Sequence, residues 1–315
     1  MRMKAMFRKN IFNFGLLFLF IFSFANEIIA NDGAGGQAGA FMRIPVNARA
    51  NGMGSAFTAV VQDPSAGWWN PAGLTAVPQI QLIGMYSMIS MDRMHNFAGI
   101  ASPLPWTNSG SIGFSWLQFG VSDIDGRDFR GQPTNKFNDN EMAFNLSYAY
   151  QIRPFINAGI TGKYLYHNLA DHSANGYGLD FGIIGNLKQQ YFYGLTLQNL
   201  VGSYKWNTDS NLKEDLPIVI RTGIGFRHHS LPLTIACDAV KIENDDQFRF
   251  YAGGEYWLFT DIFAIRAGYA FDQFNAGVSF GWQISKMDFQ IDYAYIGDAL
   301  EEGATNQFSF LVKIK

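Results

Sequence analysis

The chain has 315 residues, of which 48% are hydrophobic, 16% aromatic and only 16% charged, and its net charge at pH 7 is −3. This composition excludes a disordered or collagen-like chain, and the charge balance provides no basic patch for nucleic acid. A single cysteine, Cys237, excludes a disulfide framework within the chain.

Residues 1–30 predict a secretory signal peptide. Four basic residues precede an apolar run over 11–25, and the small residues Ser23, Ala25 and Ala30 offer cleavage sites. The alternative is a transmembrane anchor, but an anchor needs about twenty apolar residues and this run is shorter. We therefore exclude residues 1–30 from the fold and expect an exported protein.

Residues 31–78 predict a short plug, or hatch, for a larger domain. The stretch 31–40 is almost entirely small residues, which cannot build a core alone. Small residues also dominate 48–59, where Met53 and Phe57 are spaced one helical turn apart. We expect a short helix there that packs closely against a wall.

Two proline pairs follow in the same segment. Asp63-Pro64 and Asn70-Pro71 each join a capping residue to a proline suited to the first helical position. The sequence therefore predicts two short capped turns, closed by Gly73.

From residue 79 onward the chain alternates apolar and polar residues in segments of about ten residues. No segment here is apolar enough for a membrane-spanning helix, so a membrane-embedded fold would have to be a closed barrel. Such segments are the signature of transmembrane β-strands. The predicted strands number fourteen: 79–90, 94–102, 110–120, 141–151, 155–167, 175–188, 190–199, 217–228, 231–241, 247–257, 261–270, 274–283, 286–296 and 305–315.

The connections alternate in length as an outer-membrane barrel requires. If the first strand leaves the periplasm, the outward connections include the long polar stretches 121–140, 168–174, 200–216 and 297–304. The inward connections are mostly short turns. A soluble β-sandwich or propeller is the alternative. Aromatic residues on the apolar face of nearly every strand, and the lack of an internal repeat, favour the barrel.

Several motifs resemble the PorV/PorQ family of outer-membrane proteins, which are relatives of FadL-type barrels. The N-terminal motif is Ala-Arg-x-x-Gly-Met-Gly-x-Ala-Phe-x-Ala-Val over 48–60, followed by Asp63 and by Trp-Asn-Pro-Ala-Gly-Leu over 69–74. Later pieces lie at 197–200, 216–223, 253–256 and 265–269. The Asn-Pro-Ala piece is shared with FadL-like barrels. The chain departs from the family's pattern in its Lys-Ile-Lys ending and its short length.

This resemblance implies a fourteen-stranded barrel with an N-terminal hatch in the outer membrane. It also implies a docking or carrier role in type IX protein secretion, with secretion-system proteins or secreted cargo as partners. The alternative is FadL-like transport of hydrophobic small molecules across the outer membrane, with a hydrophobic ligand as partner. A third hypothesis is a structural or adhesive barrel whose loops bind a partner.

Charged residues on the polar faces of the strands predict the candidate site. They are Asp180, Arg221, Arg249, Glu255, Arg266 and Asp292. In a barrel they point into the lumen, where buried charges must pair or meet water. We expect them to anchor the hatch through Arg49 and Asp63, or to line a solute path. The candidate binding residues are Arg49, Asp63, Asn70, Arg221 and Arg266, with Arg49 the strongest candidate for hatch closure.

The sequence predicts neither catalysis, a cofactor nor a metal site. Gly52-x-Gly54 lacks the third glycine and the preceding strand of a dinucleotide loop. His228 and His229 are adjacent, so on a strand they would face opposite sides and make no metal clamp. The acidic pairs at 245–246 and 301–302 suit divalent cations, but solvated loop charge is the simpler interpretation.

Overall fold

The computed structural model describes residues 38–315, except 90–92, 108, 210–211, 260 and 298–302. All the described residues belong to one compact unit. The predicted signal peptide lies outside the described residues. Helices in the described part have at most six residues, and none is long and apolar enough to cross a membrane.

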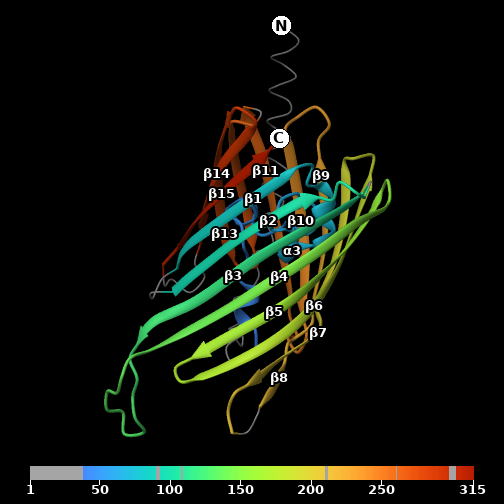
Figure 1. Cartoon of the computed structure of the whole chain (residues 1–315). Coiled ribbons are helices and arrows are strands. Elements are labelled where there is room, and N and C mark those ends of the chain that lie inside the picture. Colours follow the sequence, from blue (N-terminus) through green and yellow to red (C-terminus); the bar gives the residue numbers. More distant parts are fainter. Residues whose placement is uncertain (1–37, 90–92, 108, 210–211, 260, 298–302) are drawn as a thin grey trace. The chain divides into compact units, whose positions relative to one another are not determined.

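Among the described residues, fourteen antiparallel strands form a closed ring (Figure 1), which confirms the predicted barrel. Each strand pairs with its neighbours in sequence, and β1 pairs with β15 to close the sheet. The fourteen strands are β1 (Ile80–Ile89), β2 (Arg93–Pro103), β3 (Gly110–Ile124), β4 (Phe137–Arg153), β5 (Ile156–Leu169), β6 (His172–Leu187), β7 (Tyr191–Trp206), β9 (Val219–Arg227), β10 (Leu233–Ile242), β11 (Phe248–Phe259), β12 (Phe263–Ala270), β13 (Gln273–Ile284), β14 (Met287–Ile296) and β15 (Thr305–Ile314). The three-residue strand β8 (Lys213–Asp215) pairs only with β7.

Successive side chains along each strand point to opposite faces of the sheet, so the barrel has an apolar outer face and a packed inner face. On β4, Leu146, Tyr148 and Tyr150 are exposed on the outside, whereas Asn145 and Ser147 are buried on the inside. Closure leaves no free strand edge in the ring, so the backbone groups of the wall pair with one another. An exposed apolar exterior with a polar interior is the pattern of an outer-membrane barrel.

The outer connections are shorter than predicted because several strands are longer. Residues predicted as the loops 121–140 and 200–216 are partly strand: β3 ends at Ile124, β4 begins at Phe137 and β7 continues to Trp206. Figure 1 shows these long strands reaching toward the end that carries the 125–136 connection. At β3 and β4 the prediction was wrong because polar residues such as Asp123 and Asn138 interrupt the apolar alternation at these strand ends. On β7 the alternation continues through Tyr204 and Trp206, and the prediction ended the strand too early.

Residues 38–77, which we call the inner segment, pack against the inside of the wall. The segment contains η1 (Ala40–Arg43), α2 (Ala48–Gly52), α3 (Ala66–Trp69) and η2 (Pro71–Ala76). Helix α2 contacts strands β12 to β15, whereas η2 contacts β2 to β6. Its residues from Val46 to Leu74 are almost all buried. The inner segment therefore touches opposite parts of the ring.

The predicted helices of this segment are only partly correct. Helix α2 ends at Gly52, so Met53 and Phe57 lie beyond it rather than one turn apart on one helix. Asp63 does not cap a helix, because α3 begins three residues later and Asp63 forms a local turn with Ser65. Asn70 does cap η2, with Pro71 at its first position, as predicted.

Inward-facing glycines allow the backbone of the inner segment to lie against the wall. A Cβ atom at Gly268 on β12 would come closer than 3.0 Å to backbone atoms of Met53 and Gly54. A Cβ atom at Gly159 on β5 would come equally close to Pro71 and Ala72. These close approaches need a residue without a side chain.

Candidate functional site

The inner segment is held by a buried ion-pair cluster centred on Glu255 of β11. Arg49 of α2 donates from Nε to Glu255 Oε2 at 2.8 Å and from Nη2 to Oε1 at 2.7 Å. Arg266 of β12 donates from Nε to the same Oε2 at 2.7 Å, and its Nη1 lies 3.3 Å from Asp292 Oδ1. All four residues are at most 8% exposed. The two arginines and two carboxylates balance in charge, which such burial requires.

Asp63 closes a second polar contact within the inner segment. Its Oδ2 accepts from Asn47 Nδ2 at 3.0 Å, and its Oδ1 accepts from the Ser65 backbone N–H at 2.9 Å and from the Ser65 hydroxyl. Burial raises the pKa of the Asp63 carboxyl above its ordinary value, although the bonds from Ser65 and the charge of Arg49 counteract this. Asn47 precedes α2, and its side chain accepts from the Arg49 N–H. Asp63 thus fixes the turn from which α2 begins.

Asn70 joins the inner segment to the wall. Its Nδ2 lies 3.1 Å from the Thr58 carbonyl oxygen, 3.1 Å from that of Ile183 on β6 and 3.4 Å from that of Leu195 on β7. Its Oδ1 accepts from the Ala72 N–H at 3.2 Å. The fully buried Asn70 amide therefore bonds both to the inner segment and to the barrel wall. Buried polar groups in folded proteins need such hydrogen bonds.

Asp238 of β10 anchors the middle of the inner segment, and sequence reasoning missed it. Its Oδ2 accepts from the backbone N–H groups of Phe57 and Thr58 and from the Thr58 hydroxyl, at 3.1, 3.0 and 2.6 Å. The signal was available, because the apolar alternation through Cys237 places Asp238 on the inner face. Cys237 itself is exposed on the outer face.

Arg221 of β9 lies beneath the same part of the inner segment. Its Nη1 is 3.8 Å from Asp238 Oδ2, and its guanidinium carbon lies 4.9 Å from the Trp69 ring centre and 5.7 Å from that of Trp68. A desolvated guanidinium over tryptophan faces makes a favourable cation–π contact. Arg221 is only 4% exposed.

The structure places all five candidate residues at contacts of the inner segment, but not in one cluster. Arg49 and Arg266 share Glu255, while Arg221 and Asn70 act at separate contacts. Two further residues of the expected network pair elsewhere. Asp180 bonds Lys163 at 2.8 Å, and Arg249 bonds Asp245 at 2.8 Å.

A small cavity of about 180 Å³ lies between the inner segment and the wall at the end with short turns. Its lining includes Ala59, Thr75, Phe192 and Arg227. Arg227 donates to the Val60 carbonyl oxygen at 2.7 Å and covers the Phe192 ring at 4.6 Å. This volume is below the roughly 300 Å³ of ordinary ligand pockets. A second hollow, of about 750 Å³, is lined at the opposite end of the barrel by residues of 134–140 and 166–171.

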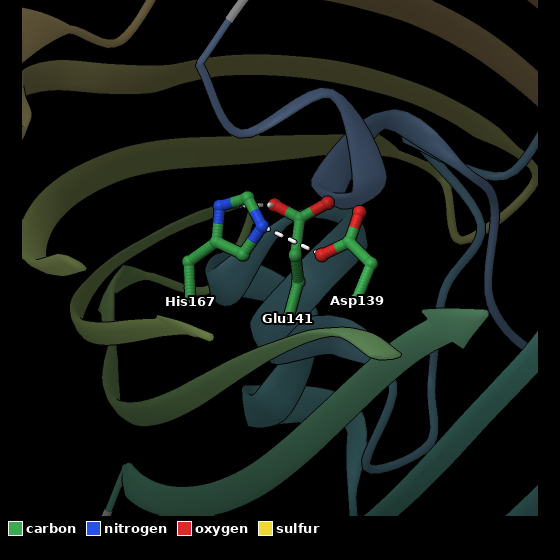
Figure 2. A group of neighbouring side chains, drawn as sticks. All are labelled: Asp139, Glu141 and His167. Atoms are coloured by element: carbon green, nitrogen blue, oxygen red, sulfur yellow. Dashed lines mark hydrogen bonds and ion pairs between the residues drawn. The ribbon is translucent and has the colours of Figure 1, made fainter. Parts of the chain in front are cut away.

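The other candidate groups named from the sequence give no cluster of their own. The rings of His228 and His229 stack at 4.8 Å in an exposed turn. Glu301 and Glu302 lie outside the described residues. Within the described part of the chain, the one group of three metal-capable side chains is Asp139, Glu141 and His167 (Figure 2).

No protein-family model matches the chain, and no curated protein matches its sequence. Solved structures do match its fold. A Pseudomonas aeruginosa FadL homologue aligns with a TM-score of 0.60 at 11% identity, covering 86% of this chain and 98% of the homologue. The Pseudomonas putida toluene transporter TodX aligns at 0.58 and 10% identity, covering 85% and 96%. The CymD monoaromatic hydrocarbon channel aligns at 0.58 and 11%, covering 86% and 98%.

At such low identity the likeness shows the fold alone: this chain has the architecture of FadL-type outer-membrane barrels. The comparisons give no support for a place in the PorV/PorQ family or for a link to type IX secretion. Of these three proteins, TodX is named as a toluene transporter and CymD as a monoaromatic hydrocarbon channel.

Proposed function

We propose that this protein is an outer-membrane channel for small hydrophobic molecules, and that the inner segment closes it. The observation that carries the proposal is the position of the inner segment, which lies inside the barrel and is bonded to strands on opposite sides. The fold supports the proposal, because structures of the same architecture are named as hydrocarbon channels and a toluene transporter.

The contacts of the inner segment suit a reversible closure. Three buried side chains hold the segment to the wall: Glu255 binds the Arg49 side chain, Asp238 accepts from the Thr58 backbone N–H, and Asn70 of the segment donates to the Ile183 carbonyl oxygen. Aromatic residues of the segment, such as Phe57, Trp68 and Trp69, pack inside the ring. These rings are the apolar surface that a displaced segment would offer to a hydrophobic solute, whereas the inner face of the wall is polar.

A disulfide lock tests this closure. The Cβ of Pro64 lies 3.4 Å from the position of a Cβ at Gly99 on β2, close to the spacing of a disulfide. The double variant Pro64→Cys/Gly99→Cys, with Cys237→Ala to remove the native thiol, links segment and wall when oxidised. Each single-cysteine variant serves as the control.

Uptake of toluene by whole cells with an intact outer membrane, in a strain that lacks the native gene and produces each variant, is the measurement. We expect uptake with the wild type and with the reduced lock, and a loss of at least tenfold when the lock is oxidised. Equal uptake in the oxidised and reduced states would show that the inner segment is not the closure. No uptake with the wild type above that of the strain without the protein would overturn the proposed function.

Localisation belongs to the same proposal. We expect the protein in the outer-membrane fraction, in contact with its lipid, after removal of the predicted signal peptide over residues 1–30. N-terminal sequencing of the purified protein tests the cleavage. The type IX secretion hypothesis rests on the sequence resemblance alone, and recovery of secretion subunits or cargo with the solubilised protein would be needed to support it.

A further inference from the structure

Three side chains that the proposed channel does not use converge near the outer ends of β4 and β5. His167 Nε2 lies 2.7 Å from Asp139 Oδ1, and His167 Nδ1 lies 3.8 Å from Glu141 Oε2. One ligand atom from each residue lies within 4.8 Å of the other two. Figure 2 shows both carboxylates directed at the imidazole.

The strand register produces this convergence. Glu141 of β4 stands directly opposite His167 of β5, and Asp139 is two residues from Glu141 on the same face. Side chains two apart on a strand, and side chains opposite on paired strands, share one face. This is the inner face, since Ala143 and Asn145 continue it as buried residues.

The cluster lies at the outer edge of the apolar band of the wall. On the outward face of β4 and β5 it is flanked on one side by the pair Met142 and Tyr166, and on the other by the pair Asn140 and Asn168. The three cluster side chains are 13% to 28% exposed. A cation from the aqueous phase therefore has access to them.

Aromatic residues of β7 support the imidazole from another side. The Trp206 ring centre lies 4.9 Å from that of His167, and the Tyr204 ring centre lies 6.3 Å away. Tyr204 is 2% exposed, and its hydroxyl has no hydrogen-bond partner in the described part of the chain. A buried hydroxyl without a partner beside the cluster leaves a polar group that a water or a ligand bound there would satisfy.

Charge balance points the same way. When both carboxyl groups are ionised, Asp139 and Glu141 bring two negative charges into one cluster, and a protonated His167 would neutralise only one of them. A divalent ion neutralises both carboxylates and leaves the imidazole neutral, which is the form that binds metals.

We propose that Asp139, Glu141 and His167 form a binding site for a divalent transition-metal ion of the zinc class, at the outer end of the barrel. One imidazole nitrogen and two carboxylate oxygens are a donor set that Zn²⁺ accepts with a fourth position open to water. The mixed donor set disfavours Ca²⁺ and Mg²⁺, which take oxygen ligands. The bound ion would tie β4 to β5 where both strands leave the apolar band.

Zinc titration of the full-length protein tests the site. The detergent-solubilised protein is stripped with a chelator and titrated with ZnCl₂ in a calorimeter, with metal content measured after dialysis. We expect one zinc per chain, and at least tenfold weaker binding in His167→Ala and Glu141→Gln. His172→Ala is the matched control, because His172 is an exposed histidine near the same end of the barrel that lies outside the cluster, and its affinity should equal the wild type's.

Two results would overturn the proposal: no stoichiometric zinc on the wild type, or unchanged binding in His167→Ala. Displacement of the zinc by an equal concentration of Ca²⁺ would overturn the metal class. The heat-dependent gel mobility of each variant reports whether the barrel is folded. A second variant, Asp139→Asn, keeps the side-chain volume and must also weaken binding. None of these measurements depends on solute uptake.

Discussion

Arg49 and Glu255, 206 residues apart in sequence, form a two-bond ion pair inside the barrel, at 2.7 and 2.8 Å. Arg266 approaches the same carboxylate from the neighbouring strand. One glutamate of the wall thus determines the position of α2. Because these side chains are buried away from water, the loss of one of them destabilises the protein more than the loss of one partner of a surface ion pair.

We expect Arg49→Met to release the inner segment. Glu255 would keep Arg266 but lose the partner that ties it to α2, and the cluster would retain one uncompensated negative charge. Leaving a buried charge uncompensated typically costs about 3–5 kcal/mol. Hydrogen exchange of the amides over residues 48–60 measures the release. Arg127→Met, at an exposed loop arginine, is the control and should leave this exchange unchanged. Unchanged exchange in Arg49→Met would mean that the ion pair does not hold the segment.

We expect Gly268→Ala to disturb the same segment by a different route. The new methyl group would meet backbone atoms of Met53 and Gly54, which cannot turn aside as a flexible side chain can. Overpacking of this kind costs about 1–3 kcal/mol. Gly162→Ala is the matched control, because a methyl group there meets nothing within 4 Å. Chemical unfolding measures both, and equal stability of the two variants would contradict the close packing.

The strands were predictable from the sequence because their alternation follows directly from one buried and one exposed face. The count of fourteen was correct, and errors concentrate at the outer ends of β3, β4 and β7. On β4, Asn138 and Asp139 make both faces polar, whereas on β7 the alternation continues through Tyr204 and Trp206. Placement of Arg49, Asn70 and Arg221 at inner contacts followed from similar reasoning. Glu255 was among the residues expected to anchor the segment through Arg49, although not singled out as its partner, and Asp238 was missed, because these wall residues meet the segment only once the barrel has closed. The short helices were the least predictable, since tertiary contacts decide elements of four to six residues.

We expect the packing of the inner segment to weaken as pH rises from the ordinary aspartate pKa. Burial raises the pKa of Asp63, so the packed state keeps a proton that the released state has lost. Stability from this group is therefore present below the ordinary value of 3.8 and is lost as pH rises through the raised value. Hydrogen exchange of residues 48–60 against pH measures the slope.

Asp63→Asn separates this effect from other titrations. The variant loses the bond from Asn47, which lowers stability by a similar amount at every pH. The contribution of Asp63 to the slope must also disappear. An identical slope in the wild type and the variant would refute the assignment to Asp63.

The apolar outer band predicts that the free-energy cost of an outward-facing arginine depends on its depth in the membrane, even along a single strand. Ile160 and Asn168 both face outward on β5, but Ile160 lies among apolar neighbours and Asn168 lies beyond them. Arginine near the bilayer midplane costs roughly 2–4 kcal/mol in such barrels and near zero outside the membrane. We therefore expect Ile160→Arg to lower the free energy of unfolding in lipid vesicles by that amount, whereas Asn168→Arg leaves it unchanged. Both variants introduce an arginine on the same strand, so its strand propensity and its charge are the same in both and do not affect the comparison. Equal effects would mean that the outer face of β5 does not meet lipid, and the barrel would then not span a membrane in this orientation.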